Sequence, residues 1–407
     1  MINKKLKVGN VPNLRFPEFT EEWETKKLGE IATFSKGKGI SKSDIEEDGI
    51  IECIRYGELY THYREVINEI KSKTNVNPST LVLSEKNDVI IPASGETTID
   101  IATASCVLKS GIALGGDLNI IKTNNNGIFL SYYLNSKKKM EIANLSQGIS
   151  VVHLYSSQLA SLSLSLPKLN EQNRISSFLA LLDERIQTQN KIIEELKLLK
   201  NTLSKKIISG QLKFKDKNGN NFPEWVSKEL AEVMSVPEKI KSKNIDKSRL
   251  LTVKLHLKGV SQNDNTNTLS LGATNYFIRK KGQFIYGKQN LFNGAFGIIP
   301  DEFDGFLSSG DVPALDIKHS KINTAYLIYF LGRVDFYKRL EDLAAGSGSK
   351  RIHETTLLGI KIDFPTIEEQ HKIANFLLSI DGKIEIETHI LQKLERQKTY
   401  FLANLFI

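Results

Sequence analysis

The chain carries the same long pattern twice, and this repeat constrains the fold more than any single motif does. Residues 166–183 read LPKLNEQNRISSFLALLD, and residues 364–381 read FPTIEEQHKIANFLLSID. Pro167 and Pro365 lie 198 positions apart, and with this offset 11 of the 34 positions that start at the prolines are identical. An alternating apolar run precedes each proline, LSLSLP in one copy and IKIDFP in the other. The sequence therefore predicts two units that each contain a strand, a proline and a helix.

A shorter echo opens each unit. FPEFTEEWETKKLGEI occupies residues 16–31, and FPEWVSKELAEV occupies residues 222–233. The chain has only two tryptophans, and a leucine follows each of them five residues later. The segments between these echoes, 32–147 and 234–345, have little sequence in common. We interpret the chain as two copies of one frame, meaning the repeated opening, strand, proline and helix, with a different variable segment in each copy.

The residues that follow each proline predict a long helix. Apolar residues recur in a heptad pattern over five heptads from Ile175 and again from Ile373, which is typical of a coiled coil. At about 1.5 Å per residue, each helix would be roughly 50 Å long. If the two helices pair in antiparallel directions, an approximate two-fold axis crosses the pair, and the two variable segments lie at opposite ends.

Two polar positions interrupt each apolar seam. Gln189 and Glu387 occupy a positions, and Lys200 and Lys398 occupy d positions. One antiparallel register sets Gln189 against Lys398 and Lys200 against Glu387, and polar seam residues of this kind fix register at a cost in stability. The alternative is that these are solvated flank positions in a looser packing. The residues predicted to pair the helices are Leu182, Gln189, Ile193, Leu196, Lys200, Leu203, Ile384, Glu387, Leu391, Leu394, Lys398 and Leu405.

The composition is that of a folded protein with a basic balance. Of the 407 residues, 40% are apolar and 25% are charged, as in ordinary globular proteins. No apolar run is long enough to span a membrane, and the N-terminal MINKKLKVGNVPNL does not have the form of a secretory signal. The net charge of +8 favours a polyanionic partner, usually nucleic acid, although many basic proteins bind none. Cys53 and Cys106 have no metal-ligand or redox spacing, so we expect reduced, buried thiols in a cytosolic protein.

The strand-to-helix segments PKLNEQNRISSFLALLD and PTIEEQHKIANFLLSID, the FPEFTEEWETKKLGEI opening and the two-unit order have a further implication. Together they resemble the specificity subunit of type I restriction–modification enzymes, over essentially the whole chain. In that family, two target-recognition domains each read one half of a split DNA site. Paired helices set the gap between the halves and dock the modification (methyltransferase) subunits.

The repeat and the resemblance predict an α+β fold class. We expect two globular mixed α/β target-recognition domains, held apart by a pair of long antiparallel coiled-coil helices in a pseudo-two-fold internal repeat. The predicted segments are a first target-recognition domain (1–166), a central spacer helix (167–210), a second target-recognition domain (211–364) and a C-terminal spacer helix (365–407).

The resemblance also implies cofactors and partners. The complex of that family methylates adenine N6 with S-adenosylmethionine, and restriction subunits can join it to translocate and cleave DNA. The resemblance implies that this chain is non-catalytic and binds no cofactor, with S-adenosylmethionine on the modification subunit and with ATP and Mg on the restriction subunit. The implied partners are double-stranded DNA, two modification subunits and restriction/translocase subunits, in the cytoplasm and away from any membrane.

The sequence lacks the motifs of the catalytic classes considered. The Asp/Asn-Pro-Pro-aromatic signature of adenine methyltransferases is absent, because no proline is followed by a second one. SKGKGISKS (35–43) does not satisfy the phosphate-loop pattern GxxxxGK[ST], and it is either a basic DNA-facing loop or a plain solvated turn. The histidines form no HxxH or HxxxH pair, so we expect His153 and His353 to be structural.

Candidate DNA-contacting residues lie in turn-rich polar stretches of the two variable segments. Phosphates require Lys, Arg and backbone N–H donors, whereas base edges require Arg, Lys, Asn, Gln, Ser or Thr on rigidly held loops. SGETT (94–98) follows the strand-like DVIIPA (88–93), as a binding loop on a scaffold does. The candidates in the first segment are Lys36, Lys38, Arg55, Tyr56, Tyr60, Ser94, Thr97 and Thr98. Those in the second are Arg279, Lys280, Lys281, Tyr286, Lys288, Gln289, Asn290 and Asn293, with Lys350 and Arg351 in the following turn.

Each candidate has a plainer alternative as an exposed loop residue that serves solubility. At the positions of Lys350 and Arg351 the first copy has Val152 and His153, which weakens any claim that the two copies contact DNA in the same way. Two other functions also stay open. A stand-alone DNA methyltransferase or nuclease would need motifs that the sequence lacks, and a bipartite protein–protein adaptor would bind no DNA.

Overall fold

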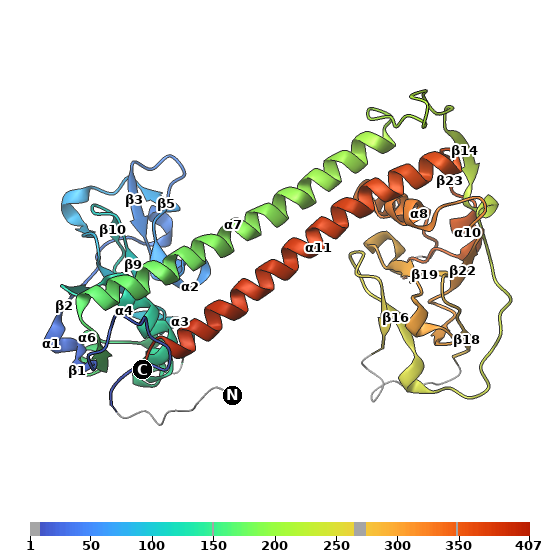
Figure 1. Cartoon of the computed structure of the whole chain (residues 1–407). Helices are drawn as coiled ribbons and strands as arrows, with labels where there is room; N and C mark the ends of the chain where they lie inside the picture. Colours follow the sequence, from blue (N-terminus) through green and yellow to red (C-terminus); the bar gives the residue numbers. More distant parts are fainter. Residues whose placement is uncertain (1–8, 149, 264–273, 347–348) are drawn as a thin grey trace. The chain divides into compact units, whose positions relative to one another are not determined.

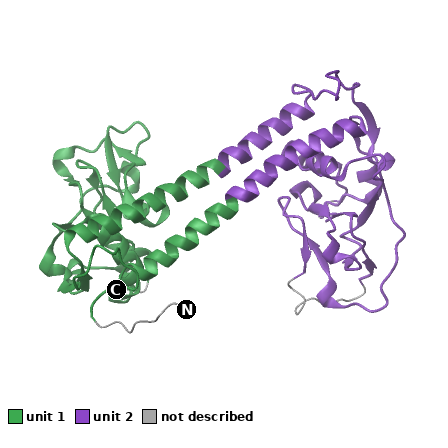
Figure 2. Ribbon diagram, in the orientation of Figure 1, with its two compact units in different colours: residues 1–192, 388–407 green, residues 193–387 purple. Residues whose placement is uncertain are grey.

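The chain divides into two compact units, which Figure 2 colours separately. Unit 1 comprises residues 1–192 and 388–407, and unit 2 comprises residues 193–387. In this computed structural model the described residues are 9–148, 150–263, 274–346 and 349–407. Two long helices, α7 (Leu169–Ile208) and α11 (Ile367–Asn404), each contribute residues to both units (Figure 1). The predicted division into four segments separates the helices from the globular parts, and it stays a prediction.

Unit 1 is built on two β-sheets. A five-stranded sheet has the order β2-β11-β7-β9-β4, and a four-stranded sheet has the order β5-β3-β10-β6. All four residues of β7 are buried, as expected for an apolar strand that is covered on both faces. The strands are β1 (Glu24–Lys27), β2 (Ala32–Lys36), β3 (Ile51–Ile54), β4 (Val66–Ile67), β5 (Ser72–Thr74), β6 (Val82–Leu83), β7 (Val89–Pro92), β8 (Ser94–Gly95), β9 (Ser105–Val107), β10 (Ala113–Leu114), β11 (Leu118–Thr123), β12 (Val152–His153) and β13 (Ser163–Leu166). The short helices are α1 (Leu28–Ile31), α2 (Glu58–Thr61), α3 (Thr98–Ile101), α4 (Gly127–Tyr133), α5 (Lys139–Leu145) and α6 (Ser156–Ala160).

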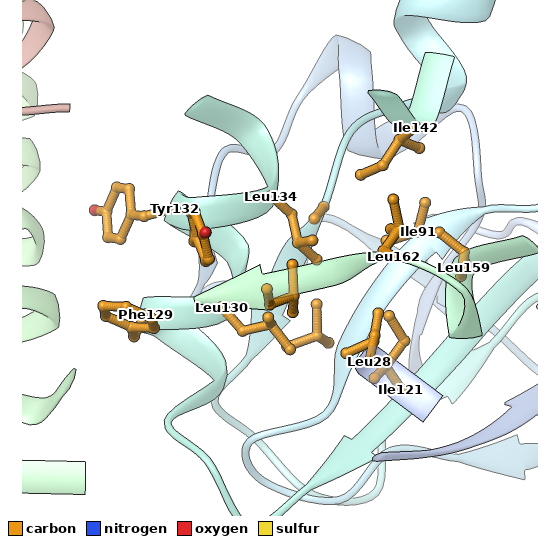
Figure 3. Packing of buried hydrophobic residues seen from close by; sticks show 14 of the residues in the cluster. Leu28, Ile91, Ile121, Phe129, Leu130, Tyr132, Leu134, Ile142, Leu159 and Leu162 are labelled. Carbon is orange, nitrogen blue, oxygen red and sulfur yellow. The ribbon is translucent and has the colours of Figure 1, made fainter. Parts of the chain in front are cut away.

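The main core of unit 1 lies between the five-stranded sheet and the short helices. Ile91 and Ile121 from the sheet pack with Leu130 from α4 and Leu159 from α6 (Figure 3). Each is fully buried, and burial of one such side chain contributes about 1.5–3 kcal/mol. Phe406, which follows α11, stacks on a tyrosine of α4 with ring centroids 5.5 Å apart. The last residues of the chain therefore belong to this core.

Unit 2 has smaller sheets and an aromatic core. Its four-stranded sheet has the order β15-β22-β19-β20, and two two-stranded sheets pair β16 with β17 and β18 with β21. Phe284 and Tyr286 of β19 pack with Phe296 of β20 and Tyr326 of α8. The strands are β14 (Val226–Glu229), β15 (Met234–Ser235), β16 (Leu251–Val253), β17 (Val260–Gln262), β18 (Tyr276–Ile278), β19 (Phe284–Tyr286), β20 (Phe296–Ile298), β21 (Leu307–Ser309), β22 (Ala314–Ile317) and β23 (Lys361–Phe364). The short helices are α8 (Thr324–Leu331), α9 (Val334–Arg339) and α10 (Glu354–Leu358).

The same strand pair precedes the long helix in each unit. In unit 1, β1 pairs with β13 in antiparallel fashion, and in unit 2, β14 pairs with β23 in the same way. Gln172 donates from Nε2 to the carbonyl of Pro167 at 2.9 Å, and Gln370 donates to the carbonyl of Pro365 at 3.0 Å. Both glutamines are buried, so these bonds satisfy amide groups that would otherwise be costly to bury. Each unit thus has the strand, proline and helix that the repeat predicts.

The two tryptophans of the FPE openings are tied to the same position of the long helices. Trp23 donates its indole N–H to Glu171 at 3.3 Å, and Trp225 donates to Glu369 at 3.1 Å. Arg15 adds two bonds of 2.7 Å to the Glu171 carboxylate. The opening of each unit is therefore anchored on the first turn of the helix that follows its last strand.

Candidate functional site

A hollow of about 1080 Å³ in unit 1 brings together three of the predicted DNA-contacting residues. Arg55, Tyr56 and Tyr60 lie on the turn after β3 and on α2, and they form one wall. Residues 39–41 and 115–117 also line the hollow. A polar hollow between loops that a sheet holds in place is a suitable site for recognition.

Close backbone packing shapes this part of the lining. A Cβ on Gly37 would lie 2.0 Å from the carbonyl oxygen of Gly115, so only glycine fits at this position. Gly39 has a φ of +71°, a left-handed conformation that favours glycine. The N–H groups of Gly37 and Lys38 donate to the carbonyls of Leu118 at 3.0 Å and Leu114 at 2.8 Å. The segment SKGKGISKS is therefore a loop at the end of β2, with the side chains of Lys36 and Lys38 exposed outside the lining of the hollow.

Arg55 has an unusual environment. Its Nε is buried and has no hydrogen-bond partner among the described residues, and its Nη2 lies 3.5 Å from Oε1 of Glu58. Glu58 is only 4% exposed, and it accepts hydrogen bonds from the Arg55 N–H at 2.8 Å and from the Ser72 hydroxyl. The carboxylate thus holds the arginine, whose side chain is 26% exposed, beside the hollow.

The SGETT stretch is not gathered into this hollow, apart from Glu96. Ser94 is buried in β8, where it pairs with His153 of β12, so its prediction as a DNA-contacting residue is corrected to a structural one. Thr97 is exposed, and its hydroxyl accepts the N–H of Asp100 at 3.1 Å at the start of α3, a typical N-cap. Thr98 is exposed on the first turn of that helix.

Two predicted residues of unit 2 are structural. Arg279 is 4% exposed, and its guanidinium donates to the Ser308 hydroxyl at 2.7 Å and to the Val312 carbonyl at 3.2 Å. Burial lowers the pKa of Arg279 to about 10. Tyr286 is fully buried in β19, and its hydroxyl donates to the Ile352 carbonyl at 3.1 Å. Both predictions of DNA contact are therefore corrected, because these side chains are committed to the core and to loop carbonyls.

The remaining candidates of unit 2 lie on loops. Lys288 is mostly buried and forms an ion pair of 2.9 Å with Glu354, so its charge is already compensated. Lys281 lies 3.5 Å from Asp301, and Lys350 lies 2.8 Å from Glu341. The other exposed or half-buried candidates are Lys280, Gln289, Asn290, Asn293 and Arg351.

Arg351 resembles Arg55 in one respect. Its Nε lies 3.4 Å from Oδ1 of Asp311, and that nitrogen makes no hydrogen bond within the described ranges. The backbone N–H of Arg351 donates to the Ala345 carbonyl at 2.9 Å, which closes the Gly/Ser-rich turn. Residues 347 and 348 of this turn lie outside the described residues.

A second hollow, of about 930 Å³, lies within unit 2. Leu257, Phe296 and Ile328 give it a largely apolar lining, and Lys200 and Asp381 lie at its wall. None of the predicted DNA-contacting residues lines it. The candidates of unit 2 therefore lie away from this hollow.

A cluster of one lysine, one aspartate and one tyrosine, which we call the Lys–Asp–Tyr cluster, joins both long helices to a short helix in unit 1. Lys398 of α11 lies 2.7 Å from Asp183 of α7 and 3.2 Å from Glu65. Tyr132 of α4 donates its hydroxyl to Asp183 at 2.5 Å, and its ring lies 5.5 Å from the lysine ammonium. Burial and the neighbouring Asp183 raise the pKa of Tyr132 well above its ordinary range.

Unit 2 contains an equivalent Lys–Asp–Tyr cluster. Lys200 of α7 lies 2.6 Å from Asp381 of α11, and Tyr329 of α8 donates to the same carboxylate at 2.5 Å. The ammonium lies 4.8 Å from the centre of the Tyr329 ring. The two lysines and the two aspartates are each 198 positions apart, so the clusters follow the offset of the repeat.

These clusters correct the predicted partners of the seam lysines. The heptad pattern predicts Gln189 as the partner of Lys398 and Glu387 as the partner of Lys200. The ion partners in the structure are aspartates that lie six residues before those positions, Asp183 for Lys398 and Asp381 for Lys200. For Lys398, a carboxylate compensates the half-buried ammonium better than the neutral amide of Gln189 would. The identity of aspartate and lysine in both copies was the sequence signal that could have indicated this pairing.

The residues predicted to pair the helices are all buried or half-buried. Leucines on the outer sides of the helices are exposed instead, for example Leu181 at 65% and Leu198 at 68%. Leu405 follows the end of α11 and packs in the core of unit 1, so it is not a helix position. The described positions are Leu182, Gln189, Ile193, Leu196, Lys200, Leu203, Ile384, Glu387, Leu391, Leu394, Lys398 and Leu405.

Two further properties concern the described part of the chain. Its histidines, cysteines and carboxylates form no group of three or more that could hold a metal ion. None of its helices combines the length and the apolar character that crossing a membrane requires. Cys53 and Cys106 are free and buried, as predicted.

The frame that occurs in both units is also found in known proteins. Residues 20–198 and 223–396 each match the family model described as the type I restriction modification DNA specificity domain. The chain belongs to the type I restriction modification DNA specificity family. The two matches correspond to the two copies of the repeat, so the resemblance drawn from the sequence is confirmed.

Individual relatives agree over nearly the whole chain. The type I restriction enzyme MjaVIII specificity subunit of Methanocaldococcus jannaschii is 26% identical over 403 residues, covering 95% of this chain and 91% of the relative. The S subunit of a type I restriction–modification system from M. genitalium has a similar fold, with a TM-score of 0.61 at 17% identity, covering 98% of this chain and 99% of that one. A chain from a structure that concerns complex assembly and conformational transition of the type I R-M system gives 0.53 at 16% identity, covering 93% and 96%. This chain is accordingly a DNA specificity subunit of that kind.

Proposed function

We propose that this specificity subunit recognises a bipartite DNA target and that each unit reads one half of it. The observation that carries the proposal is the double match to the DNA specificity family, once in residues 20–198 and once in residues 223–396. The strand pair, the tryptophan contact and the Lys–Asp–Tyr cluster recur in both units. The sheets and loops between these shared parts differ, and different loops present different donors and acceptors to base edges.

The proposal includes a role for the long helices as a spacer. We infer that α7 and α11 pair as an antiparallel coiled coil in a pseudo-two-fold arrangement and that their length sets the gap between the half-sites. Each Lys–Asp–Tyr cluster ties both helices to α4 or α8 of its own unit. Ion pairs within a helix seam specify a register better than apolar contacts alone do.

The proposal also assigns partners. The chain itself is non-catalytic and binds no cofactor, and it directs two modification subunits that carry S-adenosylmethionine and methylate adenine. Restriction/translocase subunits with ATP and Mg join the same assembly in the cytoplasm. The net charge of +8 suits a double-stranded DNA partner, and the similar chain from the structure on type I R-M complex assembly supports a multi-subunit assembly.

The test is reconstitution with the modification subunit of the same system. The complex is expected to transfer labelled methyl groups to genomic DNA, whereas either protein alone transfers none. Methyl transfer by this chain alone would instead make it an enzyme. A complex that methylates equally well without this chain, or a chain that joins the complex but adds no salt-sensitive DNA binding, would reduce it to a protein–protein adaptor.

A further inference from the structure

We infer that Arg55 reads a guanine in the half-site of unit 1, within the hollow that it shares with Tyr56 and Tyr60. This inference rests on the proposed function and deepens it by naming one base and one reading residue. It begins from the half-buried guanidinium of Arg55, whose buried Nε has no hydrogen-bond partner among the described residues and whose Nη2 lies 3.5 Å from Glu58. No other arginine described in unit 1 has a buried nitrogen without a hydrogen-bond partner.

Buried polar atoms in folded proteins almost always have a partner, and an exception requires an explanation. The Nε of Arg55 is buried without one, and the nearest carboxylate approaches the guanidinium only to 3.5 Å. The arginines with structural roles differ from Arg55, because they make short hydrogen bonds within the protein. Arg15 donates to Glu171 twice at 2.7 Å, and Arg279 donates to Ser308 at 2.7 Å. Arg55 is therefore held in position with fewer intramolecular hydrogen bonds than Arg15 or Arg279 makes.

Glu58 orients the guanidinium of Arg55. Its carboxylate is buried, fixed by the Arg55 N–H and the Ser72 hydroxyl, and lies beside one edge of the guanidinium. With Glu58 at one edge and the side chain 26% exposed, the terminal nitrogens of Arg55 can face the hollow that this residue lines. A free fork of two N–H donors matches the O6 and N7 acceptors of guanine in the major groove.

The charges around the hollow favour a base edge over a phosphate. Its lining includes four carboxylates, those of Asp44, Glu58, Glu96 and Asp117, and only two residues that are always cationic, Lys42 and Arg55. A phosphate placed here would be repelled, whereas the neutral acceptors of a base edge would not. Lys36 and Lys38 lie outside this lining and are exposed. These two lysines are therefore available to contact DNA phosphates, apart from the hollow.

The hollow is large enough to admit the edge of a base. Its volume of about 1080 Å³ is at the upper end of that of small-molecule sites. Tyr56 and Tyr60 line it beside Arg55 and are half-buried. Burial, followed by the charges of Tyr56 and Glu96, raises the pKa of Tyr60 above its ordinary value, so its hydroxyl remains a neutral donor beside the base.

The experiment compares the reconstituted complex carrying the unchanged chain with complexes carrying Arg55→Ala, Arg55→Lys or Arg64→Ala. Arg64 is an exposed arginine of the same unit that lies outside the lining, so it is the matched control for loss of one positive charge. Binding is measured on duplexes in which each base of the target is replaced in turn.

For R55A, the preference for guanine at one position of one half-site is expected to fall roughly 5- to 150-fold, as for loss of one bidentate contact. The other half-site should be unchanged. R55K should keep part of the preference, and R64A should keep all of it. If R55A does not fold, a guanine preference in R55K equal to that of the unchanged chain overturns the inference.

Three other results would also overturn the inference. These are an equal loss of binding to every duplex in R55A, an unchanged R55A profile, and a loss of base preference in both half-sites. Failure of the proposed function is distinguishable, because the complex with the unchanged chain would then show no bipartite target at all.

Discussion

Buried polar side chains hold the loops of unit 2, and Arg279 is a clear example. It follows β18, and its guanidinium bridges the Ser308 hydroxyl and the carbonyls of Ser309 and Val312. Its neighbours Lys280 and Lys281 are exposed. The three adjacent basic residues therefore have opposite roles, one structural and two on the surface.

Arg279→Ala is expected to lower the free energy of unfolding by roughly 2–4 kcal/mol, because it leaves buried acceptors without their charged donor. Urea denaturation measures this loss. Lys280→Ala is the matched control and should change stability by less than about 0.5 kcal/mol. A small effect of R279A together with a changed DNA half-site would instead restore Arg279 as a DNA-contacting residue.

The two cysteines allow a second check at this scale. Burial raises the pKa of Cys53 to about 11 and that of Cys106 to about 12. Since the thiolate is the reactive form, neither should be alkylated by iodoacetamide at pH 8 in the folded protein. Both should react in urea, as mass spectrometry would show. Stoichiometric labelling of the folded chain would contradict the packing around β3 and β9.

The sequence could not separate the buried candidates from the exposed ones. Arg279 and Lys280 belong to one basic run, and Tyr286 stands next to polar loop residues. Which of them is buried depends on where β18 and β19 begin and on which strands cover them. Arg55, Tyr56 and Tyr60 share the hollow because α2 follows β3 after a turn of three residues.

At the scale of elements, the two Lys–Asp–Tyr clusters differ in burial. The side chains of Lys398 and Asp183 are 13% and 10% exposed, whereas those of Lys200 and Asp381 are 25% and 37% exposed. Water screens the second pair more strongly. Replacing the lysine by alanine should therefore lower the free energy of unfolding more in unit 1 than in unit 2.

Lys398→Ala is expected to lower the free energy of unfolding by about 3–5 kcal/mol, because it leaves Asp183 buried without a counter-charge. Lys200→Ala should cost about 1 kcal/mol. Both are measured by urea denaturation, with Lys393→Ala on the exposed side of α11 as the control. A double replacement of Lys398 by Met and Asp183 by Leu should recover much of the loss. An equal effect of K398A and K393A would contradict this role.

The helices were the most predictable elements, and their partners were the least. Heptad periodicity and the prolines indicated the starts of α7 and α11, which begin at Leu169 and Ile367. The ion partners of the two seam lysines differ from the predicted ones, because a periodic seam permits several pairings and Asp183 is held beside Lys398 by Tyr132. A polar residue in a seam indicates that a register is fixed, but it does not identify the partner.

At the scale of the molecule, the spacer role of the helices predicts a change in DNA spacing. One helical turn is inserted in α7 between Asp183 and Lys200 and another in α11 between Asp381 and Lys398, so that both Lys–Asp–Tyr clusters are kept. Four added residues lengthen a helix by about 6 Å, which corresponds to about one or two base pairs of DNA. The gap should lengthen by that amount while both half-sequences stay the same. An unchanged gap, mapped from the methylated adenines, would rule out the spacer role.

The central claim is that this chain alone decides which bipartite sequence is methylated. The most direct measurement is genome-wide mapping of methylated adenine in a host that expresses the modification subunit with or without this chain. The account predicts methylation only when this chain is present, at one motif with two specified halves and an unspecified gap of constant length. A continuous motif, or the same methylation pattern without this chain, would contradict it.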